Sequence, residues 1–281
     1  MDPHFSADPL SDLRQLFAYP FMVHALEAGT IVAVIAGVAG WFMVLRRESF
    51  AGHTLTVMSF PGASGAALAG LPVAAGYFAS CATAALVIAA GSHTKGRRDR
   101  PRESALIGTV QAAGFALGFV FLGLYHGILE NLEDLLFGSF LGVTQTQIET
   151  LLGVGIVAIA FFAAAGRPLF YASVDEAVAR ARGVPVRALH AAFLVVLGLT
   201  VAATAQITGA LLVFALLVAP AAAAQELTAG IRLSLGLTVG FALLVAWVGL
   251  TLAYFTDYPV GFLVTSLAFG IYAVARLWKR L

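Results

Sequence analysis

Long apolar runs separated by short polar intervals are the feature that most constrains how this chain folds. Nine such runs occupy residues 21–45, 54–70, 72–91, 104–125, 147–166, 188–204, 208–224, 233–254 and 259–277. Most of them approach the roughly 20 residues that an α-helix needs to cross the hydrocarbon core of a bilayer. Only 11% of the residues are charged, whereas soluble domains average about 25%. The chain is therefore predicted to be an all-α polytopic membrane protein with eight or nine transmembrane helices.

The apolar runs form one predicted transmembrane domain over residues 21–277, with short segments at 1–20 and 278–281. The second and sixth runs are short and contain Gly, Pro or polar residues, so we expect them to be broken or tilted. Residues 135–146 are too short to span and are expected to be interfacial or re-entrant. If one of the short helices is re-entrant, the number of spans is eight. The first 20 residues show no basic region followed by an apolar core, so no signal peptide is expected.

Basic residues predict how the chain is oriented in the membrane. If the N-terminus lies outside, the inner loops contain fifteen of the sixteen Lys and Arg residues, and only Arg14 lies outside. This asymmetry follows the positive-inside rule. We therefore expect a multi-pass protein of the plasma (cell or inner) membrane, with residues 1–20 extracytoplasmic and the tail at 278–281 cytoplasmic.

Glycine spacing predicts close contacts between helices. Four G-x-x-x-G pairs are Gly114/Gly118, Gly123/Gly127, Gly138/Gly142 and Gly236/Gly240. This motif allows the backbones of two membrane helices to approach each other.

The polar interval at 166–187 is predicted to contain a short helix with a cap at each end. Ser173 and Glu176 stand in the S-x-x-E relation of a capping box. Gly183 and the proline two residues later supply a stop signal, which gives a cytoplasmic helix over 173–183. Such a helix is too short to cross a bilayer or to be stable alone in water, so it must pack against something.

One face of this short helix is predicted to be apolar. The side chains at i, i+3, i+4 and i+7 are Val174, Ala177, Val178 and Ala181. The polar side chains that keep the remaining surface in water are Asp175, Arg180 and Arg182. In a chain that otherwise has the pattern of a channel or carrier, a separate cytoplasmic protein is the expected partner.

The sequence contains no energy source for uphill transport. Its two lysines, Lys95 and Lys279, do not lie in a G-x-x-x-x-G-K-[ST] motif, so no P-loop for ATP is present. A series of buried carboxylates and histidines, as in a proton relay, is absent as well. A permease driven by a separate ATPase fits this pattern, and an ATP-independent secondary carrier or channel is the alternative. Nucleic-acid binding is not expected, because topology explains the basic run at 93–103.

Five residues are candidates for the solute route. Glu27 is expected to face protein or water, or to be an interfacial residue near the outer end of its helix, and His24 lies on the same helical face. His53 carries an imidazole, a common ligand of transition metals, although a lone histidine at a helix start is more often a cap or surface residue. Gln206 either lines a cavity or forms a turn. Pro220 frees a backbone carbonyl within a span and is a candidate hinge.

Four segments in their order along the chain resemble the permease subunits of zinc/manganese-type metal-ion ABC transporters. They are FMVHALEAGTIVAVIAGVAGWFMVLRR at 21–47, the G-x-x-L-x-x-x-x-x-P-G run at 52–62, SVDEAVARARGVPVR at 173–187 and GALLVFALLVAPAAAAQEL at 209–227. The last segment is similar to the Gly-x-Leu-Leu-Val…Pro-Ala-Ala helix of that family. The resemblance extends from about residue 21 to the end of the chain.

The resemblance implies partners and a cargo. The chain would pair with a second copy or a homologous permease to form a pore, two cytoplasmic ABC ATPases would bind beneath it, and an extracytoplasmic metal-binding protein would dock above. The coupling helix of the family maps onto residues 174–183, so the candidate ATPase contacts are Val174, Asp175, Glu176, Ala177, Val178, Arg180, Ala181 and Gly183. The cargo would be a divalent zinc, manganese or iron ion, or alternatively a metal chelate or an organic nutrient. No permanently bound cofactor is implied, because ATP acts through the partner.

One position departs from the family pattern. Related permeases commonly have Gly-Asp-x-Leu-Ser/Ala-His-Ala after the first basic pair, and the Asp and His are thought to serve the metal. Here the Asp position holds His53 and the His position holds Val57. The exchange favours His53 as a metal contact, weakens the assignment of zinc over manganese or iron, and equally fits a subgroup with another cation or chelate.

Overall fold

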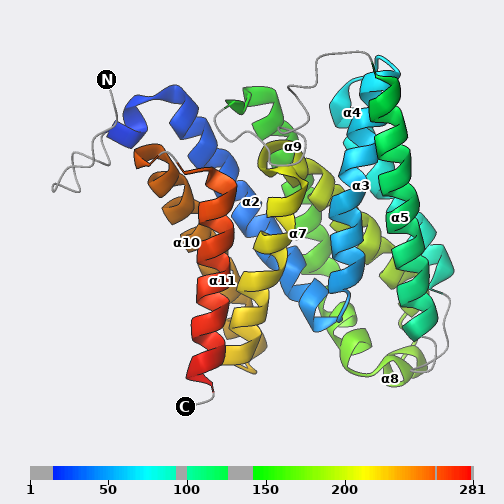
Figure 1. The fold of residues 1–281 in the computed structure, drawn as a ribbon. Coiled ribbons are helices and arrows are strands. Elements are labelled where there is room, and N and C mark those ends of the chain that lie inside the picture. Colours follow the sequence, from blue (N-terminus) through cyan, green and yellow to red (C-terminus); the bar gives the residue numbers. More distant parts are fainter. Residues whose placement is uncertain (1–14, 93–99, 126–141, 257, 280–281) are drawn as a thin grey trace.

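Every element in the described part of the chain is a helix. The computed structural model describes residues 15–92, 100–125, 142–256 and 258–279 (Figure 1). Its helices are α2 (Pro20–Leu45), α3 (Ser49–Leu68), α4 (Val73–Gly91), α5 (Arg100–Leu124), α7 (Gln145–Val174), α8 (Glu176–Ala181), α9 (Val186–Leu227), α10 (Ile231–Phe255) and α11 (Val260–Trp278). The prediction of an all-α membrane protein is confirmed.

Each of the nine predicted apolar runs forms a helix or one half of a helix. Seven of the described helices are long and apolar enough to cross a membrane. The other two runs correspond to α3, which contains several polar residues, and to Leu212–Leu227, the short second half of α9. The possible re-entrant segment at 135–146 lies for the most part outside the described residues.

Helix α9 reverses its direction at Gly209. A straight helix of its 42 residues would be about 63 Å long, roughly twice the hydrocarbon thickness. Gly209 has φ 75° and ψ 157°, a conformation that glycine adopts readily. His190, near the start of α9, contacts Arg46, while Gln225, near its end, donates a hydrogen bond to the carbonyl oxygen of Trp41. Both ends of α9 therefore lie beside the C-terminal end of α2. This agrees with the prediction of two separate apolar runs, at 188–204 and 208–224.

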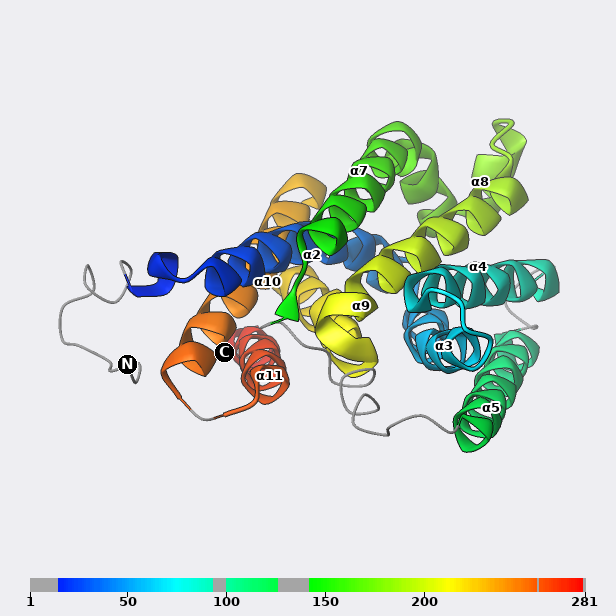
Figure 2. The same cartoon turned by 90° about the horizontal axis from the view of Figure 1, so that it is seen from above.

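Helix α9 occupies the centre of the bundle. It packs against α2, α7, α10 and α11 on one side and against α3 and α4 on the other. Seen from above in Figure 2, α3, α4 and α5 form a group at one side of α9, and α2, α7, α10 and α11 lie at the other. Helices α5 and α11 are at the periphery, and only 17% of the residues in the apolar window of each are buried. The core thus depends on contacts that both halves of α9 make.

Hydroxyl groups in the buried part of α3 are hydrogen-bonded to backbone carbonyl groups. Thr56 Oγ1 donates to the oxygen of His53, and Ser59 Oγ donates to that of Thr56, each over 2.6 Å. Ser80 of α4 donates to the oxygen of Met58 over 2.7 Å and so links α4 to α3. Satisfied polar groups of this kind are what a helix needs when water is excluded from its surroundings.

The predicted glycine pairs contribute unequally to packing. A Cβ atom at Gly114 or Gly118 would overlap side chains of α3, which confirms that this pair permits a close approach. A Cβ atom at Gly123, Gly236 or Gly240 would meet nothing within 4 Å, so these glycines make no close helix contact in the described chain. Gly127 and Gly138 lie outside the described residues.

Candidate functional site

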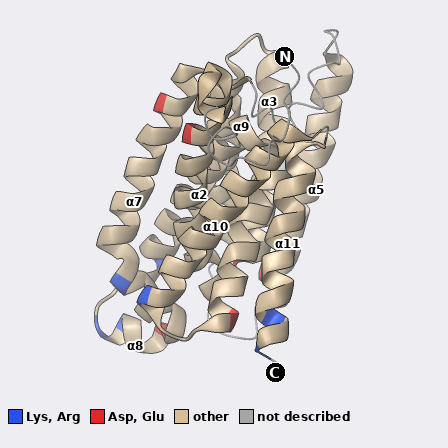
Figure 3. Cartoon of the chain, turned by 90° about the vertical axis from the view of Figure 1, so that its left-hand side faces the viewer, with Lys and Arg blue, Asp and Glu red and all other residues tan. Residues whose placement is uncertain are grey.

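Helix α8 and the polypeptide around it form the polar end of the bundle. Figure 1 shows α8 and the C-terminus at one end and the N-terminal end of α2 at the other. Lys and Arg residues gather at the end that contains α8 (Figure 3). Arg46 and Glu48, between α2 and α3, contact Ser173 and His190 on the two sides of α8, so these two predicted inner loops meet at this end.

The start of α8 differs from the prediction. The preceding helix α7 does not end at residue 166 but continues past Pro168 to Val174, with Leu169 fully buried. Ser173 therefore lies in the last turn of α7, where its hydroxyl donates to the oxygen of Leu169 over 2.5 Å. The predicted capping box of Ser173 and Glu176 is consequently wrong.

Asp175 is the residue that caps α8. Its Oδ1 atom accepts a hydrogen bond from the backbone N–H of Val178 over 3.0 Å. This leaves a helix of 6 residues, Glu176–Ala181, in place of the predicted 173–183. The S/T-x-x-E/Q signature does form a capping box elsewhere, with Thr144 and Gln147 at the start of α7.

The end of α8 matches the prediction. Gly183 has φ +81°, and its N–H donates to the oxygen of Arg180 over 2.9 Å. The N–H of Val184 donates to the oxygen of Ala179 over 3.1 Å. These two bonds make a Schellman motif, in which glycine takes the left-handed position.

The apolar side chains predicted to form one face of the short helix are all exposed, although Val174 is the last residue of α7 and precedes α8. The exposed apolar side chains are Val174, Ala177, Val178 and Ala181, with Val174 68% and Val178 50% exposed. Ala179, between them, is buried and holds α8 against its neighbours α7 and α9. On the exposed surface, Arg180 and Glu176 form an ion pair. An apolar face next to charged groups is thus free to contact another molecule.

Three charged or titratable side chains cluster beside α8. Arg46, at the end of α2, contacts Glu48 over 2.9 Å, and Glu48 precedes α3. His190 Nδ1 lies 3.0 Å from Arg46 Nη2 and 3.3 Å from Glu48 Oε1. The guanidinium of Arg46 also lies 4.9 Å from the ring centroid of Phe193 and 3.5 Å from Ser173 Oγ. Sequence reasoning missed this cluster, because 144 residues separate Arg46 from His190.

The cluster changes the acidity of Glu48. Burial by itself raises the pKa of this carboxyl group. The hydrogen bond from His190 and the positive charges of Arg46 and His190 outweigh burial, so the net pKa lies below its ordinary value. Glu48 is therefore held in its ionised form.

His53 lies in the second turn of α3, close to the same end of the bundle. Its ring is in contact with that of Phe214 from α9, with 4.7 Å between the centroids. Its Nδ1 atom is buried and makes no hydrogen bond with any described residue. A buried ring nitrogen without a partner is available as a ligand for an ion passing this point.

The other predicted polar candidates lie toward the opposite end. His24 is half-buried and Glu27 is exposed near the start of α2, so within this chain Glu27 does not face the interior. Gln206, near the reversal of α9, donates to the oxygen of Ala202 in its own helix over 3.1 Å. These residues are therefore not brought together with His53. Across the described ranges, no three His, Cys, Asp or Glu side chains are grouped so as to hold a metal ion.

Pro220 is buried in the second half of α9. It has no N–H to donate to the oxygen of Leu216, which weakens the helix at this point. The carbonyl oxygen of the next residue, Leu217, lies close to Gly40 of α2. A Cβ atom on Gly40 would overlap this oxygen. The candidate hinge thus adjoins a tight contact with α2.

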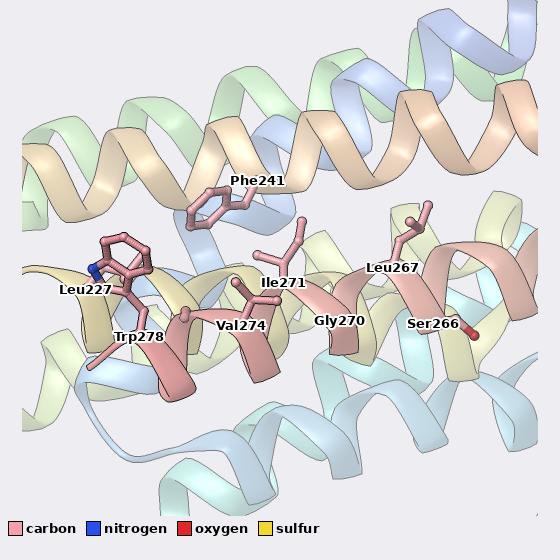
Figure 4. A pocket seen from close by; sticks show the side chains of 9 residues that line it. Leu227, Phe241, Ser266, Leu267, Gly270, Ile271, Val274 and Trp278 are labelled. Carbon is pink, nitrogen blue, oxygen red and sulfur yellow. The ribbon is translucent and has the colours of Figure 1, made fainter. Parts of the chain in front are cut away.

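A groove of about 580 Å³ runs along α11 and is distinct from the polar residues above. Figure 4 shows Phe241 of α10 and Trp278 of α11 beside it. The lining residues are Leu227, Phe241, Ser266, Leu267, Gly270, Ile271, Val274, Ala275 and Trp278. Ser266 is the one hydroxyl residue in this lining, so the groove offers apolar contact and no set of metal ligands.

Comparison with known proteins gives a consistent result. A family model described as the ABC 3 transport family matches residues 18–279. The manganese transport system membrane protein MntC of Halalkalibacterium halodurans is 30% identical over 93% of this chain and 88% of that protein. The chelated iron transport system membrane protein YfeC of Yersinia pestis is 28% identical over 91% of this chain and 85% of its own length. The solved structure of PsaBC from Streptococcus pneumoniae in complex with Fab is similar with a TM-score of 0.82 and 25% identity, covering 95% of this chain and 94% of that chain.

Proposed function

The chain belongs to the ABC 3 transport family and is a metal-ion permease subunit of an ABC transporter, and we propose that a separate cytoplasmic ATPase drives it through α8. The sequence contains no P-loop, so ATP hydrolysis is assigned to that partner and the permease is not itself an enzyme. A helical bundle without a nucleotide site needs a contact through which the ATPase can act on it.

The observation that carries this proposal is the exposed apolar face of α8. Val174, just before α8, is 68% exposed, and Val178, within α8, is 50% exposed. Helix α8 lies at the end of the bundle where basic residues gather. When a protein partner covers apolar side chains outside the membrane, they are removed from water and the free energy falls. The candidate contact surface consists of Val174, Asp175, Glu176, Ala177, Val178, Arg180, Ala181 and Gly183.

We also propose an orientation in the membrane and further partners. We place the basic end with α8 and the C-terminus in the cytoplasm, and the N-terminus outside the plasma membrane. A second copy or a homologous permease would complete the pore, and a metal-binding protein would dock on the outer end. The relative of known structure named PsaBC supports an assembly of this type.

The proposed cargo is a divalent manganese or iron ion. The relatives described above are named for manganese and for chelated iron, which favours these metals over zinc. His53 is the proposed contact on the route, since its Nδ1 atom is buried without a hydrogen-bond partner among the described residues. Imidazole is a common ligand of iron, whereas manganese more often takes oxygen ligands, so a contact at His53 is more typical of iron.

Uptake into proteoliposomes tests the division of labour. Vesicles that contain the paired permease with its ABC ATPase, with the metal-binding protein at the outer face, should accumulate manganese when ATP is supplied to the cytoplasmic face. The chain alone should neither hydrolyse ATP nor accumulate manganese. Accumulation by the chain alone under an ion gradient would establish a secondary carrier in place of an ABC permease. Competition between free manganese, free iron and chelated iron then identifies the preferred form of the cargo.

A pair of matched substitutions tests the contact surface. Ala177→Asp places a charge on the exposed face of α8 and should abolish co-purification with the ATPase. Ala229→Asp makes the same change at an exposed alanine between α9 and α10 and should leave co-purification intact. Retention of the ATPase by the Ala177→Asp protein would remove α8 from the interface.

A further inference from the structure

The hydrogen bonds at His190 Nδ1 are mutually exclusive. This atom lies 3.0 Å from Arg46 Nη2 and 3.3 Å from Glu48 Oε1. A guanidinium only donates and a carboxylate only accepts, whereas a ring nitrogen does one or the other according to its protonation. Without a proton, Nδ1 accepts from Arg46, and with a proton it donates to Glu48. The cluster therefore has two distinct hydrogen-bonded arrangements.

Burial makes these arrangements energetically important. The side chains of Arg46, Glu48 and His190 are 9%, 15% and 16% exposed. Glu48 Oε2 and His190 Nε2 are buried and find no partner among the described residues. Ion pairs of this kind are weak sources of stability, because desolvation offsets their attraction, and apolar residues often replace them without loss. A role other than stability accounts better for their presence.

The cluster joins the two segments that flank α8 to the start of α3. Ser173 lies two residues before Asp175, the cap of α8, and His190 lies in the first turns of the following helix α9. Both contact Arg46, which is hydrogen-bonded to Glu48 at the N-terminal boundary of α3. The cluster therefore links the segments on both sides of α8 to the helix that carries His53.

The surroundings of His190 are few and identifiable. From the end of α2 comes the charge of Arg46, from the turn before α3 the carboxylate of Glu48, and from α7 the hydroxyl of Ser173, which contacts Arg46. Phe193 of α9 covers the guanidinium. A change in the hydrogen-bond partner of Nδ1 thus changes a contact between α9 and either the end of α2 or the start of α3.

We propose that Arg46, Glu48 and His190 are positioning residues that transmit the movement of α8 to α3, and that the exchange of the Nδ1 hydrogen bond between Arg46 and Glu48 sets how tightly ATP hydrolysis is coupled to metal uptake. The proposal rests on the function proposed above for α8. The residues contact neither ATP nor the metal, so they alter the coupling of the two events and not the events themselves.

The test measures manganese ions taken up per ATP hydrolysed by the assembled complex in proteoliposomes. His190→Leu and Glu48→Gln should each lower this ratio about three- to tenfold, the range expected for residues that carry coupling between sites. Because both belong to one network, the double variant should be no worse than the poorer single variant. Lys279→Gln breaks an exposed ion pair at the same end of the bundle and serves as the control.

His190→Asn separates a positioning role from a merely structural one. The asparagine amide offers both a donor and an acceptor near the position of Nδ1, so it can hydrogen-bond with Arg46 or Glu48 and should largely restore the ratio.

Two results would overturn the proposal. One is an unchanged ratio in His190→Leu and Glu48→Gln, even if both lower the unfolding temperature of the complex. The other is a ratio in His190→Asn that is as low as in His190→Leu. A wild-type complex whose uptake does not depend on ATP would instead refute the proposed function of α8, so the two failures are distinguishable.

Discussion

Gly62 of α3 and Gly76 of α4 oppose each other where the two helices touch. A Cβ atom built on either glycine would overlap the carbonyl oxygen of the other. The contact therefore depends on hydrogen at both positions, since even one methyl group would push the backbones apart. It holds α3, the helix of His53, against α4.

Gly76→Val tests this contact. The added side chain must displace the backbone of α3, and overpacking of this kind costs about 1–3 kcal/mol. The unfolding temperature in detergent should fall, which a thermal melt measures. Gly240→Ala adds a Cβ atom in open space and is the control. An unchanged melt for Gly76→Val would show that α3 and α4 separate freely.

Gly183→Ala tests the end of α8. A Cβ atom at this residue meets nothing within 4 Å, so the substitution acts only through the positive φ of +81°. Holding alanine in this left-handed conformation costs about 1–2 kcal/mol and should fray α8. The affinity for the ATPase should fall accordingly in a titration. Gly183→Asn should bind better than Gly183→Ala, because asparagine tolerates this conformation, and equal affinities for all three proteins would contradict the prediction.

His53→Ala tests the metal route. Loss of the buried ring nitrogen should raise the half-saturating manganese concentration for uptake about tenfold, the scale on which altered metal surroundings change affinity. His53→Asp should keep most of the affinity, since related permeases have aspartate at this position by resemblance. Initial uptake rates over a range of manganese concentrations measure both. If His53→Ala transports like the wild type, the histidine only packs against Phe214.

Glu48 predicts a loss of stability in acid. Its folded-state pKa is lowered, so ionised Glu48 stabilises the fold at neutral pH, and this contribution disappears as the pH falls below the ordinary value of 4.5. Melts at decreasing pH should therefore show a smaller acid effect in Glu48→Gln than in the wild type. Glu149→Gln, at an exposed position of α7, should retain the acid effect of the wild type. Parallel curves for Glu48→Gln and the wild type would contradict the assignment.

Local sequence signals predicted the helices well. Hydrophobic runs mark each membrane helix, because burial in lipid demands apolar side chains over the whole length of a span. Gly183 marked the end of α8 correctly, since a left-handed residue in a Schellman motif has a strong preference for glycine. The predicted start of α8 was wrong because α7 continues through Pro168 to Val174. The burial of Leu169 stabilises this last part of α7.

Contacts between distant segments were not predictable in the same way. Gly62 and Gly76 belong to different helices and form no G-x-x-x-G pair, so nothing in either segment identifies the other. The same holds for Arg46 and His190, whose contact arises only when α2 and α9 pack together. The proposed roles of His53 and of α8 remain predictions.

The reversal at Gly209 has a consequence for how the protein is made. Leu212–Leu227 is shorter than the roughly 20 residues that insert into a bilayer as an independent span. With almost no connecting loop, we expect it to enter the membrane together with Val186–Gly209 as one helical hairpin. Its contact with Gly40 is then available at once, because α2 is synthesised earlier, whereas the contacts of α9 with α10 and α11 form only when those helices follow.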